Sequence, residues 1–179
     1  RMMALLITDK FAPHPGGTAV IYHQWAKRIP DGGLAVLTCT VPNRDHRAID
    51  GELRARVSRV PYVDIPKVRM PLCWLLLFLT APIVMLRTRP AVLHAGQPLE
   101  TGFIAWFWGS VFRRPFVLHS FGDEVAFYWH RGLAGKVMRF LALRADKITV
   151  ISTYSACKLR QLGIPERKIT LVYPGVDWS

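Results

Sequence analysis

Two short apolar segments of the chain each end in a histidine, a side chain that exchanges protons and forms hydrogen bonds near neutral pH. One segment runs from Ala91 to His94, and the other runs from Phe116 to His119. Open α/β sheets bind ligands at the carboxyl ends of their strands, so both histidines are candidates for one crevice. The alternative is that they are core histidines with satisfied hydrogen bonds, His94 to a backbone carbonyl.

A glycine and two acidic residues follow the second segment. Gly122 interrupts the strand, and Asp123 and Glu124 come directly after it. Strand alternation places His119 and Phe121 on one face of the sheet. A histidine and two acids at the carboxyl end of a strand suit contacts to a substrate. A satisfied histidine beside two solvated acids is the alternative without function.

A proline- and glycine-rich stretch follows the first predicted strand. Residues 11–18 read FAPHPGGT, and a predicted helix begins at Gly17. Gly16 and Gly17 let the backbone come close to a ligand, and the helix N-terminus offers unpaired N–H groups to an anion. The stretch is neither G-x-G-x-x-G nor a Walker A loop. Its alternative interpretation is a simple turn that joins a strand to a helix.

These residues depend on an alternation of strands and helices along the chain. Runs rich in Val, Ile and Leu predict strands at Ala4–Thr8, Leu34–Thr40, Val57–Val63, Ala91–His94, Phe116–His119, Lys147–Ile151 and Lys168–Val172. Helices are predicted at Gly17–Arg28, Leu72–Arg87, Thr101–Phe112, Gly132–Arg144 and Thr153–Leu162. The alternation predicts an α/β fold with a doubly wound parallel sheet and helices on both faces. The polar segment Val41–Ala55 is predicted to be a loop.

The composition limits the class of protein. The chain has 179 residues, 51% of them hydrophobic, which suits one domain with a core and excludes intrinsic disorder. Its 24 Lys and Arg against 12 Asp and Glu leave a net charge of +12, which predicts attraction to polyanions. Three scattered cysteines argue against a disulfide framework and a zinc site and favour a reducing cytosol.

Two apolar helical segments carry aromatic residues and end beside arginines. The segments are Met70–Leu86 and Thr101–Phe112. The arginines that follow them are Arg87, Arg89, Arg113 and Arg114. The first segment is short for a membrane span and contains Pro82, so we expect a buried or surface-docked helix, with a transmembrane span as the alternative. Apolar helices beside cations suit docking on an anionic membrane surface, and the alternative is that they belong to the core.

The C-terminal part of the chain has a specific order of residues. It reads ADKITVIS, then a predicted helix, then GIPERKITLVYPGVD up to Asp177. This order resembles the segment A-D-x-I-x-x-x-S…G-I-P…K-I-x-V-x-x-N-G-V-D of the retaining glycosyltransferases of family 4 (GT4), which have the GT-B fold. Pro174 stands where that family most often has asparagine. The loop at Gly16 and Gly17 resembles the family's N-terminal glycine loop, and Ala91–Gln97 resembles its D-V-V-H-x-H strand.

The sequence departs from the family pattern at two positions. The family usually has a histidine directly before the glycine of H-G-x-[DE], but Phe121 stands there and His119 lies two residues earlier. Glu124, or alternatively Asp123, matches the acid. Gly96 takes the place of the second histidine in D-V-V-H-x-H.

The resemblance implies that residues 1–179 form one Rossmann-like domain, the N-terminal, acceptor-side half of a GT-B fold. On this resemblance, the domain that holds the nucleotide-sugar is expected to lie outside this chain, and the chain alone is expected to be inactive. The intact enzyme is expected to transfer a sugar from a nucleotide-sugar donor to a carbohydrate or lipid-linked acceptor with retention of configuration. No metal or other cofactor is expected, because cationic side chains and helix N-termini stabilise the leaving diphosphate.

The resemblance also implies roles for single residues. His119 and Glu124 are expected to be catalytic. Substrate binding is expected at Gly16, Gly17, Asp123 and His94. The expected location is cytoplasmic, peripheral on the inner face of the membrane if the membrane interpretation holds. The alternative function is a non-catalytic basic α/β module that binds polyanions or nucleotides; the basic residues are dispersed and show no nucleic-acid recognition motif, so nucleic acid is not an expected partner.

Overall fold

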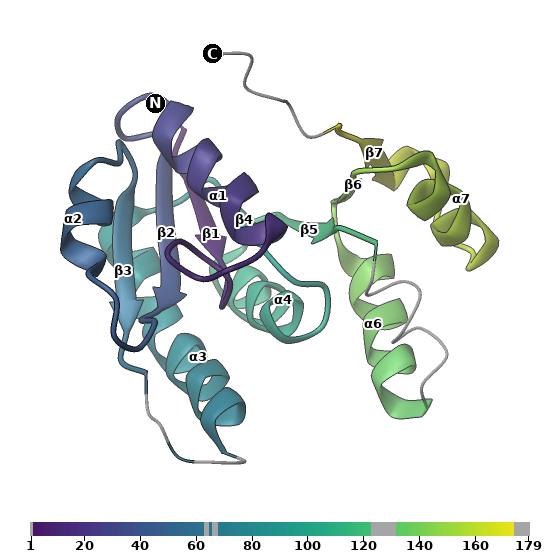
Figure 1. The fold of residues 1–179 in the computed structure, drawn as a ribbon. Helices are drawn as coiled ribbons and strands as arrows, with labels where there is room; N and C mark the ends of the chain where they lie inside the picture. The colour runs from purple at the N-terminus through teal and green to yellow at the C-terminus, as the bar shows by residue number, and fades with distance from the viewer. Residues whose placement is uncertain (1, 63–64, 66–67, 123–131, 174–179) are drawn as a thin grey trace.

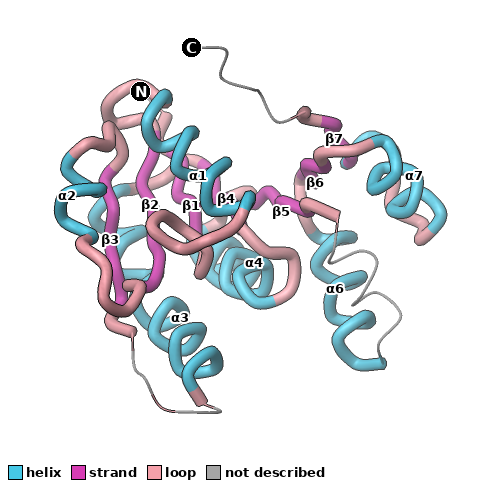
Figure 2. The backbone as a smooth tube through the Cα atoms, viewed as in Figure 1, coloured by secondary structure: helices cyan, strands magenta, loops and turns pink. Residues whose placement is uncertain are grey.

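A computed structural model of the chain describes residues 2–62, 65, 68–122 and 132–173. These residues form a sheet with helices on both of its faces (Figures 1 and 2). The strands are β1 (Ala4–Ile7), β2 (Leu34–Cys39), β3 (Arg56–Val60), β4 (Val92–Ala95), β5 (Phe116–Ser120), β6 (Lys147–Val150) and β7 (Ile169–Leu171). The helices are α1 (Gly17–Arg28), α2 (His46–Gly51), α3 (Arg69–Thr88), α4 (Glu100–Phe112), α6 (Gly132–Arg144), α7 (Thr153–Gln161) and the 3₁₀ helix η1 (Glu166–Lys168).

The sheet has seven strands in the order β3-β2-β1-β4-β5-β6-β7, and every neighbouring pair is parallel. This confirms the predicted doubly wound α/β fold. All six residues of β2 are buried, as expected for a strand covered on both faces. The strand order reverses between β1 and β4. The carboxyl ends of these two strands therefore mark the point where open α/β sheets bind ligands.

Two apolar cores lie on opposite faces of the sheet. The larger core packs residues of α3, α4, α6 and α7 around strand residues such as Leu5, Leu93 and Leu118. The smaller core packs α1 around Leu6 and Val36. Because side chains alternate along a strand, the neighbouring residues Leu5 and Leu6 supply both cores. Helix α1 therefore covers the face of the sheet opposite to α3 and α4.

The segment Val41–Ala55, predicted to be a loop, contains the short helix α2. The Asp45 carboxylate caps this helix by accepting hydrogen bonds from the N–H groups of Arg47 and Ala48. The prediction was wrong at this point because α2 has six residues and buries none of them. A helix without a buried face leaves no apolar periodicity in the sequence.

The prediction against a disulfide was also wrong. Cys39, the last residue of β2, and Cys73, near the start of α3, form a disulfide across a sequence separation of 34 residues. Their pairing depends on how α3 returns across the sheet beside β2, which the scattered spacing does not reveal. The cysteine pattern therefore gives no support for a reducing compartment. Cys157 on α7 is a free, exposed cysteine.

Helix α3 combines an apolar sequence with one buried face. Within the described residues it is the one helix long and apolar enough to cross a membrane, with 20 residues and a mean hydropathy of 1.8. It buries Cys73, Leu77, Ala81, Val84 and Met85. These side chains belong to the larger core, so α3 packs on the sheet as the helix of a folded domain does.

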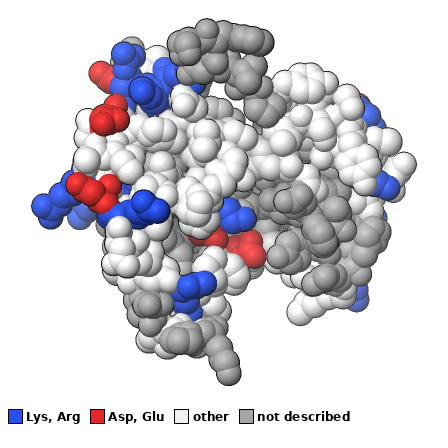
Figure 3. Space-filling view, in the orientation of Figure 1, with Lys and Arg blue, Asp and Glu red and all other residues white. Residues whose placement is uncertain are grey.

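The basic side chains are spread over several elements. On the face shown in Figure 3, Lys and Arg form separate groups with uncharged side chains between them. Some of these groups lie beside acidic side chains. The described Lys and Arg side chains visible on this face therefore form no continuous basic tract of the kind that follows a nucleic-acid backbone.

Candidate functional site

Helix α1 begins with two glycines, directly after the loop that leaves β1. Gly16 has a φ of 124°, which strains any residue with a side chain, and it caps the helix without a side-chain hydrogen bond. A Cβ atom at Gly16 or Gly17 would meet no heavy atom within 4 Å in the described structure. The first N–H groups of a helix lack intrahelical partners. The first turn of α1 contains no acidic residue that would repel an anion. This geometry leaves space and donors for an anionic ligand.

A buried arginine holds the loop in front of these glycines. The Arg59 side chain on β3 is 7% exposed and forms an ion pair with Asp50 of α2, with both N–O distances between 2.7 and 2.8 Å. It also donates to the Ala12 carbonyl at 2.7 Å and lies over the Phe11 ring at 5.6 Å. Residues far apart in sequence thus fix the path of the chain into α1.

His94 and His119 lie side by side on the adjacent strands β4 and β5. The Nδ1 atom of His94 is 2.9 Å from Nε2 of His119, and the two rings are stacked with centroids 5.1 Å apart. The Nδ1 atom of His119 is hydrogen-bonded to the Thr149 hydroxyl on β6. The structure thus brings the two histidines together, and the partner of His94 is a side chain instead of a backbone carbonyl.

Burial keeps both histidines uncharged at neutral pH. His119 is 1% exposed and His94 is half-buried. Burial lowers the pKa of His94 from 6.5 to about 4. Burial, with a smaller effect of the neighbouring His94, lowers the pKa of His119 from 6.5 to about 3. Each neutral ring then has one N–H donor and one acceptor nitrogen.

The hydrogen bonds couple the tautomers of the two rings. If His119 donates to Thr149, His94 must donate to His119, and Nε2 of His94 is then an acceptor. If Thr149 donates to His119, every hydrogen bond reverses and Nε2 of His94 becomes a donor. The half-buried His94 can therefore present either a lone pair or an N–H group.

Aromatic rings surround His119. Tyr22 and Trp25 of α1 contact it edge-on with ring centroids 5.9 and 5.1 Å away, and Phe121 stacks on it at 6.3 Å. The predicted placement of His119 and Phe121 on one face is thus confirmed. Sequence reasoning missed Tyr22, Trp25 and Thr149. Tyr22 and Trp25 could have been found from their spacing, because aromatic residues three positions apart lie on one face of a helix.

Close packing explains why a glycine stands at position 96. A Cβ atom there would lie 2.6 Å from the Thr8 side chain and 3.2 Å from the Ile7 carbonyl oxygen. The Gly96 carbonyl accepts a 2.8 Å hydrogen bond from the Tyr22 hydroxyl. The second histidine of the D-V-V-H-x-H pattern would not fit here, and the hydrogen bond ties β4 to α1.

A second polar network, which sequence reasoning also missed, joins β1 to the start of α4. Gln97 Nε2 donates to the Thr8 hydroxyl at 3.0 Å, and the Gln97 backbone N–H donates to the Thr101 hydroxyl at 2.8 Å. All three side chains are buried. The network fixes the carboxyl ends of β1 and β4 at the point where the strand order reverses.

The remaining predicted residues are not placed. Asp123 and Glu124 lie outside the described residues, so their roles stay predictions. Among the residues that the structure describes, no group of three or more His, Cys, Asp or Glu side chains could hold a metal ion.

Comparison with known proteins identifies the family. The family model described as Glycosyltransferase Family 4 matches residues 15–179. The chain belongs to glycosyltransferase family 4. No curated protein sequence matches this family 4 chain significantly.

Solved structures share its fold. HepE from Anabaena, in complex with UDP and glucose, matches 99% of the family 4 chain with a TM-score of 0.71 and 19% identity. Sucrose-phosphate synthase from Thermosynechococcus elongatus matches 99% of it with a TM-score of 0.74 and 15% identity. The lipopolysaccharide outer core galactosyltransferase WaaB matches 100% of it with a TM-score of 0.66 and 14% identity. These structural matches confirm the predicted fold, a Rossmann-like half of a GT-B fold.

The chain spans less than half of each of these proteins. It covers 45% of HepE, 49% of sucrose-phosphate synthase and 47% of WaaB.

Proposed function

We propose that this chain is the acceptor-side domain of a retaining glycosyltransferase that transfers a sugar from a nucleotide-sugar to an acceptor. One arrangement carries the proposal: helix α1 begins at the open glycine turn, and its Tyr22 and Trp25 side chains contact the His119 ring of the histidine pair. Family membership supports sugar transfer. HepE is described with UDP and with UDP-glucose, so uridine diphosphate sugars are the first donors to test.

The proposal gives each part of the site a task. The backbone at Gly16 and Gly17 approaches the donor diphosphate or the acceptor, and the α1 N-terminus stabilises negative charge. His94 binds a substrate hydroxyl through Nε2, as donor or acceptor according to its tautomer. His119 lies within hydrogen-bonding distance of His94 and positions it. A second domain supplies the nucleotide-sugar site, in keeping with the 45% of HepE that the chain covers.

The experiment uses the complete gene product that contains this chain. Release of UDP and formation of glycoside are measured with UDP-glucose, UDP-galactose and UDP-N-acetylglucosamine, with and without a membrane extract as the source of acceptors. We expect sugar transfer that persists in EDTA and a product with the anomeric configuration of the donor. An inverted product, or activity that requires added metal, would contradict the retaining, metal-free mechanism. No transfer from any nucleotide-sugar would contradict the function itself.

Two glycine substitutions test the site. In Gly17→Val the new side chain enters open space, so the fold is retained while the approach of a ligand is blocked. Gly51→Val is the matched control, because a Cβ atom at Gly51 also meets nothing within 4 Å and α2 lies away from the histidine pair. We expect kcat/KM to fall about tenfold or more in Gly17→Val, which corresponds to at least ~1.4 kcal/mol, and to stay unchanged in the control. Equal activities would remove the glycine turn from the site.

The histidine pair is tested with His94→Asn. The shorter amide keeps a polar group near His119 but removes the outer nitrogen that would reach a substrate. We expect kcat/KM to fall about tenfold, with a changed KM for the acceptor. Wild-type kinetics in a folded His94→Asn variant would show that the histidine pair is structural.

A further inference from the structure

One face of helix α3 is apolar although it lies on the outside of the domain. Leu75, Leu79, Ile83 and Leu86 are 51%, 55%, 49% and 64% exposed. Their spacing of four, four and three residues places them on one stripe of the helix, opposite to the residues that pack on the sheet. A stripe of four large exposed aliphatic side chains on one helix indicates a surface that contacts something apolar.

Helix α4 extends this surface sideways. The Phe78 ring of α3 stacks on Phe103 at 6.4 Å and contacts Phe107 at 5.1 Å, so the two helices form one layer. Phe103 is 43% exposed and Val111 is 57% exposed. We call the exposed apolar side chains of α3 and α4 the α3–α4 face.

Arginines line one end of the α3–α4 face. Arg87 and Arg89 at the C-terminus of α3, and Arg113 and Arg114 at the C-terminus of α4, are all exposed. In the sequence from residue 65 to residue 122, Glu100 is the one acidic residue, and it lies in the first turn of α4, at the other end of that helix. The cations at this end of the face therefore have no acidic neighbour on either helix.

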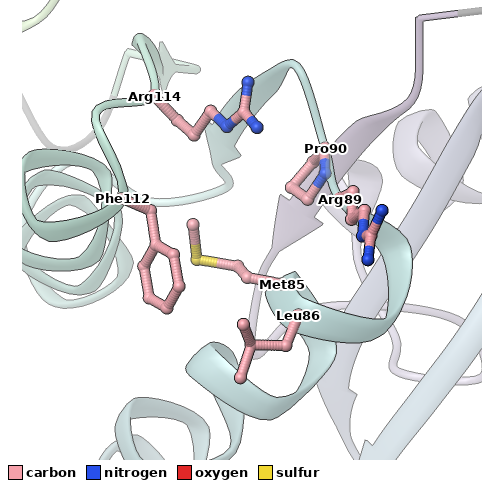
Figure 4. A pocket seen from close by; sticks show the side chains of 6 residues that line it. All are labelled: Met85, Leu86, Arg89, Pro90, Phe112 and Arg114. Atoms are coloured by element: carbon pink, nitrogen blue, oxygen red, sulfur yellow. The ribbon is translucent and has the colours of Figure 1, made fainter.

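A pocket of about 220 Å³ lies between the C-termini of these two helices. Its lining residues are Met85, Leu86, Arg89, Pro90, Phe112 and Arg114. In Figure 4 the Met85 and Phe112 side chains point toward each other, and Arg89 and Arg114 lie on either side of Pro90. Apolar walls beside two arginines fit a molecule that is apolar at one end and anionic at the other.

We propose that the α3–α4 face docks on an anionic lipid bilayer, with Arg89 and Arg114 in contact with lipid phosphates. The apolar stripe lies in the plane of the interface, and the half-exposed phenylalanines sit at the level of the headgroups, where aromatic residues are favoured. Juxtaposed cations add attraction to an anionic leaflet. The inference is independent of the proposed sugar transfer.

The packing of α3 favours docking over spanning. Leu77, Ala81 and Met85 of α3 are 0%, 0% and 3% exposed and belong to the larger core. Moving α3 across a bilayer would strip these contacts from β1, β2 and β3. If α3 instead lies on the membrane surface, its core contacts are kept and only its exposed apolar stripe contacts the lipid.

Cosedimentation with vesicles tests the proposal on the purified chain without any donor or acceptor, so failure here leaves the glycosyltransferase proposal untouched. Vesicles of phosphatidylcholine alone are compared with vesicles that also contain about a third phosphatidylglycerol, at ~50 mM and ~500 mM NaCl. We expect binding to the anionic vesicles at low salt and its loss at high salt. No binding to anionic vesicles at low salt would overturn the proposal, as would equal binding to both compositions.

Matched variants distinguish membrane binding through this face from binding through the net charge of the protein. Arg89→Gln/Arg114→Gln should weaken binding about 25-fold, about fivefold per arginine. Arg44→Gln/Arg47→Gln, on exposed positions of α2 and the residues before it, removes the same charge and should leave most binding intact. Equal losses in both pairs would mean that the net charge of +12, and not this face, drives binding.

A second pair tests the apolar stripe. Leu79→Gln is compared with Val20→Gln on α1, since the two side chains are 55% and 58% exposed. We expect about fivefold weaker binding for Leu79→Gln and no change for Val20→Gln. Sedimentation velocity without vesicles then measures the oligomeric state of the wild type and of Leu79→Gln. If the wild type is a dimer and Leu79→Gln is a monomer, the face binds a second copy of the chain, and the membrane proposal is overturned.

Discussion

The histidine pair should make the stability of this domain depend on pH from about 7.5 down to the folded pKa values of about 4 and about 3. His94 and His119 have pKa values lowered to about 4 and about 3 in the folded chain, whereas both return to about 6.5 on unfolding. Because the folded pKa values are the lower ones, the unfolded chain binds more protons in this range. The contribution of the pair to stability is therefore fully present above about pH 6.5 and is lost as the pH falls.

The magnitude follows from these pKa values. Between about pH 7.5 and about pH 5.5, each histidine should cost ~1.3 kcal/mol of the free energy of unfolding, and the pair ~2.7 kcal/mol. Below about pH 5 the loss continues by ~1.4 kcal/mol per pH unit for each ring until its folded pKa is reached. A loss of this size is a large part of the stability of a typical domain.

Urea denaturation at a series of pH values measures the effect through tryptophan fluorescence, since Trp25 contacts His119. Other groups also titrate, so the test compares the wild type with His94→Asn, His119→Gln and the double variant. Each single substitution should remove ~1.3 kcal/mol of the difference between the two pH values, and the double variant ~2.7 kcal/mol. The variants that carry His119→Gln are expected to be less stable at neutral pH, because they lose the hydrogen bond between His119 and the Thr149 hydroxyl.

The control is Phe121→Leu, which removes ring contact with His119 without removing a titrating group. It should lower stability by a similar amount at both pH values, ~1 kcal/mol. The reasoning is refuted if the double histidine variant and the wild type lose the same free energy between the two pH values. In that case the histidines would not be held neutral by burial.

Three further changes test the framework of the site. Gly96→Ala places a Cβ atom 2.6 Å from the Thr8 side chain, so it should lower the free energy of unfolding by ~1–3 kcal/mol in urea titrations; a neutral effect would mean that the strands separate easily. Asp50→Ala leaves the buried Arg59 without its ion pair and should cost ~3 kcal/mol, while a loss below ~0.5 kcal/mol would show an exposed pair. Reduction of the Cys39–Cys73 disulfide should lower the free energy of unfolding by ~2–4 kcal/mol. A thiol assay on the unreduced, denatured chain should detect one thiol, and three thiols would show that the disulfide does not form.

The strands and helices could be predicted because their signals are local. Each β-strand of the sheet falls within or beside a predicted run, such as Phe116–His119 for β5, because Val, Ile and Leu runs of strand length mark themselves by composition alone. The alternation of elements then restricts the topology to a doubly wound sheet. Helix α2 was not predicted because it buries none of its residues. The disulfide between Cys39 and Cys73 was not predicted because it joins segments that are distant in sequence.

The candidate site divides in the same way. From the sequence it follows that histidines stand near the carboxyl ends of two strands and that glycines open α1, because each feature lies within a few residues of its own element. Only the tertiary structure decided that His94 touches His119, that Thr149 completes the chain of hydrogen bonds, and that α1 supplies the surrounding rings. These contacts depend on the register of three strands and on the path of a helix across them. No periodicity within a single segment encodes such relations.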